Sequence, residues 1–158
     1  MIEIMEEQER VILFGVSGSY GNFGGEERMK ESLDELEELV ATAGGVTLAK
    51  VIQNLENPNP GTYLGKGKIE EIREMAGELQ ATGVVCDEEL SPVQLRNLEQ
   101  ALEMKVMDRT LIILDIFASR ATSSEGKIQV ELAQLKYRAA RLVGLRNSLS
   151  RLGGGIGT

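Results

Sequence analysis

Apolar residues follow two kinds of pattern along this chain. Four short segments have the composition or alternation that is typical of strands: 11–16, 46–53, 83–87 and 105–108. In the segments between them, apolar residues recur at three- and four-residue steps, as in amphipathic helices over 26–43, 69–79 and 91–102. Strands that alternate with helices indicate right-handed βαβ units. We therefore expect an α/β fold with a small four-stranded, mainly parallel sheet and flanking helices.

Capping signals mark two of the predicted helix starts. Ser91 precedes a proline and is followed three residues later by Gln94, which is the sequence of a capping box. Thr122 and Glu125 have the same spacing before a long helical pattern. The sequence therefore predicts capping boxes at both places.

The pattern changes after the last predicted strand. Segment 110–120 is compatible with a helix, although 111–114 alone could be a strand. A second, long helix is predicted because apolar residues then recur in a seam close to a heptad repeat: Ile128, Leu132, Leu135, Ala139, Leu142, Leu145 and Leu149. We expect this seam to pack on helix 110–120, so that Leu135→Ala costs about 2–5 kcal/mol. A coiled-coil dimerisation module is the alternative.

These patterns divide the chain into an α/β subdomain over 1–107 and an antiparallel helical hairpin, with one long helix, over 108–150. The expected assembly is a monomer. The first residues are acidic and do not resemble a signal peptide, and no run of about 18 apolar residues could span a membrane. We therefore expect a cytoplasmic protein.

Composition and charge limit the kinds of site and partner that this chain can have. The chain has no histidine and one cysteine, Cys86, in an apolar run that favours a buried thiol. Its net charge is -8, yet residues 105–158 hold nine Lys or Arg against four acids, an excess of +5, whereas the first 104 residues carry -13. A basic helix face is most often only solvated, but this excess makes phosphate contact with RNA an alternative. The candidate residues are Lys127, Lys136, Arg138, Arg141, Arg146 and Arg151.

Two sets of residues are candidates for a ligand site. The loop formed by Gly65, Lys66, Gly67 and Lys68 precedes a predicted helix and could hold an anion or ATP, although it does not fit a P-loop. Asp87 follows the apolar run of one predicted strand and Asp108 closes another, where they could line a site or cap a helix. No nucleophile paired with a base is evident. We expect no catalytic residue, no metal site and no cofactor in this chain.

Four stretches together resemble the HflX family of GTPases. They are YLGKGK at 63–68, DEELSPVQLRNLE at 87–99, VMDRTLIILDIFASRA at 106–121 and EGKIQVELAQLKY at 125–137. Their order and spacing match the family from about residue 45 onwards, whereas the first 44 residues match only in general pattern. Residues 151–158 look like the opening of the family's glycine-rich linker. The resemblance implies the N-terminal module of such a protein, with GTP and Mg²⁺ bound by a C-terminal GTPase domain that lies beyond this sequence.

The same resemblance implies a partner. In the family, this module works with its own C-terminal GTPase domain to bind the large (50S) ribosomal subunit and to separate the subunits, notably after stress. The family hairpin projects toward ribosomal RNA. We accordingly expect a ribosome-binding module that is not itself an enzyme. Some members are described as binding or hydrolysing ATP through this part, which keeps the loop at Gly65–Lys68 as an alternative site.

Overall fold

The sheet has four strands, all of them parallel. The structure is a computed structural model that describes residues 8–20, 24–137 and 139. Its strands are β1 (Arg10–Val16), β2 (Val46–Gln53), β3 (Gly83–Cys86) and β4 (Lys105–Asp108), in the spatial order β2-β1-β3-β4. Every pair of neighbours is parallel. The predicted four-stranded sheet is confirmed.

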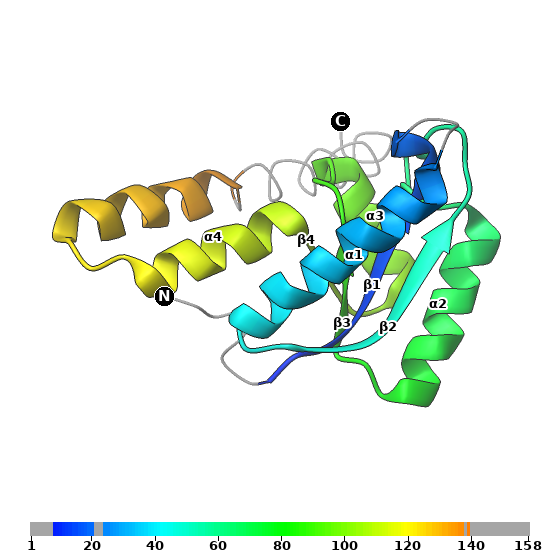
Figure 1. Ribbon diagram of the computed structural model, residues 1–158, viewed down its shortest axis with the longest axis horizontal. Coiled ribbons are helices and arrows are strands. Elements are labelled where there is room, and N and C mark those ends of the chain that lie inside the picture. The colour runs from blue at the N-terminus through cyan, green and yellow to red at the C-terminus, as the bar shows by residue number, and fades with distance from the viewer. Residues whose placement is uncertain (1–7, 21–23, 138, 140–158) are drawn as a thin grey trace, which may run out of the picture.

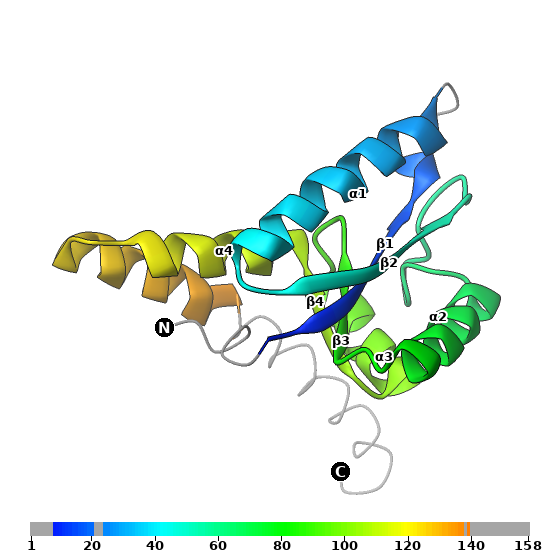
Figure 2. The same cartoon turned by 60° about the horizontal axis from the view of Figure 1, so that its bottom comes forward.

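Helices cover both faces of this sheet. Figure 2 shows α1 (Gly25–Thr42) and α4 (Arg109–Arg120) on one side, with α2 (Lys66–Leu79) and α3 (Pro92–Leu102) on the other. A short 3-10 helix, η1 (Ser17–Tyr20), follows β1. Successive side chains of a strand point to opposite faces, so Ile12 packs with α2 and α3 while Leu13 packs with α1 and α4. The result is a three-layer α/β domain with two apolar cores.

The two predicted capping boxes have different outcomes. Ser91 accepts a hydrogen bond from the amide of Gln94 at 3.1 Å, and the Gln94 side chain accepts from the amide of Ser91 at 3.0 Å, so the first box is confirmed. The second is wrong, because the next helix runs over 124–137 and Ser123 accepts from the amide of Gly126 at 2.9 Å. The cap therefore lies one residue later than Thr122, and the glycine three residues on has no side chain to complete a box.

Helix 124–137 returns along α4 in the direction opposite to it (Figure 1). Two polar contacts join them: the Gln134 side-chain amide donates to Asp115 at 3.1 Å, and the Tyr137 hydroxyl donates to Asp108. Residues 140–158 lie outside the described residues. The long helix to residue 150, the complete hairpin over 108–150 and the linker at 151–158 therefore stay predictions.

The apolar seam does not pack on α4 in the described part of this helix. Ile128, Leu132 and Leu135 are 64%, 50% and 62% exposed, and Ala139 is exposed as well. Gln134 and Tyr137 face α4 instead, because the carboxylates of Asp108 and Asp115 are fully buried there and need donors that a leucine cannot supply. The predicted packing is wrong for these residues, and so is the expected cost of Leu135→Ala in a monomer. Leu142, Leu145 and Leu149 lie outside the described residues.

Asp108 joins the sheet to three other segments. Its carboxylate accepts from the amide of Leu111 at 3.0 Å, which caps α4, and from the amide of Leu90 at 2.9 Å. The Tyr137 hydroxyl supplies a third donor. Burial raises the pKa of the Asp108 carboxyl, and the three donors offset part of that rise. The contacts of Asp108 with Leu90, Leu111 and Tyr137, here called the junction, set where helix 124–137 lies against the α/β domain.

Loss of one of these donors should destabilise the junction. We expect Tyr137→Phe to lower the free energy of unfolding by about 1–3 kcal/mol, because a buried carboxylate loses a hydrogen bond. Urea denaturation measures this loss, and hydrogen exchange should be faster in 124–137. Gln129→Ala, on the exposed side of the same helix, is the control. Equal stability of Tyr137→Phe and the parent chain would contradict the assigned contact.

The raised pKa of Asp108 gives a second prediction. In the folded chain this carboxyl binds a proton at pH values above its ordinary pKa of 3.8, where the unfolded chain does not. The resulting stabilisation is present below about pH 3.8 and is lost as the pH rises through the raised pKa. Asp108→Asn lacks this titration. The free energy of unfolding of the parent minus that of Asp108→Asn should therefore fall as the pH rises from acid to neutral, measured by urea denaturation. A difference that rises or stays constant would be inconsistent with the raised pKa.

Candidate functional site

A parallel sheet usually binds ligands at the carboxyl ends of its strands, above all between two neighbouring strands whose following connections lead to opposite faces of the sheet. In this sheet that place lies between the carboxyl ends of the neighbouring strands β1 and β3. The residues that follow these strands meet side chains from α1 and α4 there. This part of the sheet is therefore the candidate site that the fold indicates.

Asp87, which follows β3, is held by the partly buried Arg109. Its carboxylate accepts from Arg109 at 2.8 Å and from the Ser32 hydroxyl at 2.8 Å. Arg109 also donates to Glu35 at 2.9 Å, to the carbonyl of Ser32 at 2.9 Å and to the carbonyl of Asp87 at 3.0 Å. Burial lowers the pKa of the Arg109 guanidinium, but Asp87 and Glu35 more than offset this and the pKa is raised. The cluster ties α1 and α4 to β3, and its donors are consumed within the protein.

Tyr63 occupies the matching place beside β1. Its hydroxyl accepts from the amide of Val16 at 3.1 Å and donates to Glu88, and its ring packs edge-on against Phe14 with the ring centres 5.8 Å apart. Burial raises the pKa of Tyr63, and burial likewise raises the pKa of the Cys86 thiol well above its ordinary range. Cys86 is thus the buried thiol that the sequence predicted, and it is unsuited to act as a nucleophile. No role for Tyr63 was predicted from the sequence beyond its place in the stretch at 63–68; its backbone has the left-handed φ of 64°.

The loop at Gly65–Lys68 lies at the N-terminus of α2, as expected, but its groups are partly engaged. The amide of Gly65 donates to the Gln53 side chain at 2.8 Å, and a Cβ at this glycine would come within 2.9 Å of the same side chain. Lys68 forms an ion pair with Glu71 at 2.7 Å, whereas Lys66 and Gly67 are exposed. The close approach of Gln53 explains the first glycine without any ligand.

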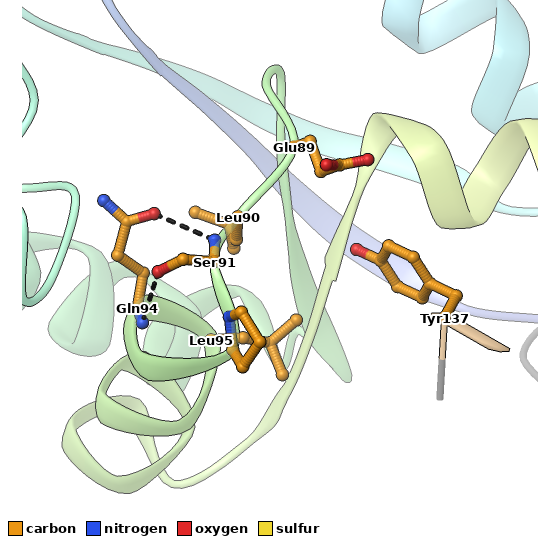
Figure 3. Close-up of a pocket in the computed structure, with 7 residues that line it drawn as sticks. Glu89, Leu90, Ser91, Gln94, Leu95 and Tyr137 are labelled. Carbon is orange, nitrogen blue, oxygen red and sulfur yellow. Dashed lines mark hydrogen bonds between the residues drawn. The ribbon is translucent and has the colours of Figure 1, made fainter. Parts of the chain in front are cut away.

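Two surface hollows lie near the same edge. One, of about 370 Å³, is lined by residues that precede and begin α3, and by Tyr137. Figure 3 shows Glu89 and Tyr137 on one side of it and the capping box of Ser91 and Gln94 on the other. The second, of about 480 Å³, lies between Ser17, Asn54 and the start of α1. Neither hollow is lined by the loop at Gly65–Lys68 or by the predicted RNA-binding residues.

The predicted RNA-binding residues are only partly within the described chain. Lys127 and Lys136 are exposed on helix 124–137, which extends with α4 to one side of the sheet (Figure 1). Arg141, Arg146 and Arg151 lie outside the described residues, as does the side chain of Arg138. Tyr137, which follows Lys136 on this helix, donates its hydroxyl hydrogen to Asp108. Its hydroxyl is therefore engaged at the junction.

The described residues offer neither a cluster of metal ligands nor a helix suited to a membrane. Among residues 8–20 and 24–137, no three His, Cys, Asp or Glu side chains are grouped so that they could hold a metal ion. Within the same residues, none of the helices combines the length and apolar character that crossing a membrane requires.

Comparison with known proteins identifies relatives over the whole chain. Residues 30–118 match the family described as GTP-binding GTPase N-terminal, and residues 120–158 match the GTP-binding GTPase middle region. GTPase HflX of Lacrimispora saccharolytica is 71% identical over all 158 residues, which cover 36% of that relative. GTPase HflX of Escherichia coli is 48% identical over 127 residues, which are 80% of this chain and 30% of the relative. The chain thus spans about a third of the length of these relatives.

Solved structures support the same assignment. The complex of SsGBP with GDP superposes with a TM-score of 0.68 at 25% identity, over 92% of this chain and 40% of that one. A GTP-binding protein of the archaeon Sulfolobus solfataricus in complex with GDP gives a TM-score of 0.64 at 26% identity, over 89% and 40%. The earlier resemblance to HflX GTPases is confirmed, and the chain belongs to the family of GTP-binding GTPase N-terminal domains.

Proposed function

We propose that this chain is the ribosome-binding part of an HflX-type GTPase, which binds the large (50S) ribosomal subunit and helps to separate the subunits under stress. The observation that carries the proposal is the separation of charge along the chain, +5 over residues 105–158 against -13 before them. Membership of the GTPase family supports it. A ribosomal partner also implies that the protein works in the cytoplasm.

The chemistry of the proposed contact is that of cations with phosphates. Lys127 and Lys136 are exposed on helix 124–137, and Arg138, Arg141, Arg146 and Arg151 follow in the sequence. A guanidinium can engage a phosphate with two donors at once, which suits the backbone of ribosomal RNA. The acidic α/β domain would be repelled by the same RNA. The basic segment is therefore the side we expect to face it.

GTP binding and hydrolysis, with Mg²⁺, belong in this proposal to a C-terminal GTPase domain outside the sequence. The loop at Gly65–Lys68 does not fit a GTP site. The amide of Gly65 is engaged by Gln53, and Ile69 occupies the place where a P-loop has the hydroxyl residue that binds magnesium. The chain itself is proposed to bind without catalysing.

Reversal of the basic charges should weaken ribosome binding. We expect Arg138→Glu, Arg141→Glu and Arg146→Glu together to abolish most co-sedimentation with purified large subunits, and Lys127→Glu with Lys136→Glu to reduce it. Binding of the parent chain should also fall by roughly tenfold or more between about 50 and 200 mM salt, because each phosphate contact releases counterions.

Lys66→Glu, a reversal of charge on the exposed start of α2, is the control and should bind like the parent. Circular dichroism checks that each variant is folded. Binding that is indifferent both to salt and to the triple change would mean that the acidic α/β face makes the contact, and the assigned surface would be wrong.

The nucleotide alternative has its own test. Isothermal titration of the chain with GTP should give no micromolar dissociation constant, because no P-loop is present. We expect weak or undetectable binding of ATP. If ATP binds at the loop Gly65–Lys68, Lys66→Ala and Lys68→Ala should each lower the affinity for ATP. Unchanged affinity in both variants would place the site elsewhere.

A further inference from the structure

We propose that Arg109 is a positioning residue, which fixes the direction in which α4 and helix 124–137, here called the arm, extend from the α/β domain. The inference rests on the function proposed above, because the arm carries Lys127 and Lys136 to the partner. Three features support it: the contacts of one side chain, their burial, and the length of helix that extends beyond them.

Arg109 joins α4 to two other elements through one guanidinium. Toward the end of β3, it donates to the Asp87 carboxylate at 2.8 Å and to the Asp87 carbonyl at 3.0 Å. Toward α1, it donates to Glu35 at 2.9 Å and to the Ser32 carbonyl at 2.9 Å. A planar guanidinium holds its acceptors in one fixed geometry. These bonds therefore limit the rotation of α4 as well as its distance from the sheet.

The contact between Arg109 and Asp87 is the better protected of the two ties. The side chains of Asp87 and Arg109 are 2% and 20% exposed, whereas that of Glu35 is 69% exposed. An ion pair held away from water is screened less than a surface pair, and removal of one member leaves the other charge buried alone. We therefore expect the tie to β3 to be strong and the tie to α1 to be weaker.

The place of Arg109 in α4 gives these ties control over the arm. Arg109 is the first residue of the helix, and all buried residues of α4 lie within 109–116. Beyond them Phe117 is 57% exposed, and the arm extends past the side of the sheet (Figure 1). The helix from Arg109 to Arg120 is about 16 Å long, so a rotation of roughly 10° in its first turn moves the far end by about 3 Å. A small change at Arg109 is thus enlarged along the arm.

The direction of the arm matters for a partner whose phosphates have fixed positions. Lys127 and Lys136 lie on the part of the arm that follows α4, so a change of direction displaces both. When only a fraction of the molecules has the binding-competent conformation, the apparent affinity falls by that fraction. If loss of Arg109 leaves roughly one molecule in five to ten with the native direction, the dissociation constant rises about fivefold to tenfold.

Distances within the chain test this role without any partner. Spin labels on Glu78→Cys in α2 and Ser119→Cys in α4 report the direction of the arm, because both sites are exposed, while Cys86 is buried and stays unlabelled. Pulsed electron paramagnetic resonance should give a narrow distribution of distances for the labelled parent and a broader one for Arg109→Ala. Arg109→Lys keeps the charge but not the fork of donors, so its distribution should be intermediate.

Arg73→Ala is the matched control, because Arg73 also joins two elements by an ion pair, with Glu103, but on the opposite face of the sheet. It should leave the distribution unchanged. Glu35→Ala removes only the exposed acceptor and should broaden the distribution less than Arg109→Ala does. If circular dichroism shows that Arg109→Ala is unfolded, Glu35→Ala and Arg109→Lys decide. Distributions that match the parent in every folded Arg109 and Glu35 variant overturn the proposal, and so does equal broadening by Arg73→Ala.

Co-sedimentation with large subunits tests whether the partner requires this direction. Arg109→Ala should raise the dissociation constant about fivefold to tenfold although every basic residue of the arm after α4 is retained, and Arg73→Ala should bind like the parent. A broadened distribution with undiminished binding overturns the positioning role. Failure of the parent itself to sediment with large subunits would instead contradict the proposed function, and the distances would still decide whether Arg109 fixes the arm.

Discussion

A carboxylate that is removed from water must be given hydrogen-bond donors, and Asp108 is such a group, with none of its surface exposed. The donors come from three directions: the first turn of α4, the segment before α3, and Tyr137 on the returning helix. Leu90 and Tyr137 are far from Asp108 in the sequence, and both contact its carboxylate at the end of β4. The position of helix 124–137, and with it of the exposed Lys127 and Lys136, therefore depends on this buried charge.

Asp87 and Arg109 serve a related purpose at the next strand. The arginine is surrounded by acceptors from β3 and α1, so its charge is satisfied inside the protein. Between β1 and β3, the carboxyl edge of the sheet, where α/β proteins commonly bind small molecules, is partly occupied by these internal polar contacts. In the function proposed above, contact with the partner is made by the basic segment that begins on helix 124–137 rather than at this edge.

The strands β1 and β3 could be predicted because they are short apolar runs that are buried on both faces. The helices could be predicted because each buries a face on which apolar residues recur with a period near 3.6 residues. Ser91 was also predictable, since a capping box is a local feature. The docked face of helix 124–137 was not. A heptad-like seam indicates that a helix has a partner, but it does not say which partner, and here the contact with α4 is made by Gln134 and Tyr137. Charge separation was visible in the sequence, whereas the engagement of Gly65 by Gln53 depends on tertiary structure.

The strand order has a consequence for how the chain folds. β1 comes first in the sequence but lies in the interior of the sheet, between β2 and β3. Its second neighbour is complete only at Cys86, so this almost wholly apolar strand stays without one of its two partners until more than half of the sequence has been synthesised. Pairings that close such long loops lose much chain entropy before they are rewarded, which slows folding. We therefore expect the nascent domain to gain its native contacts late and together, and to be most prone to aggregation before β3 emerges.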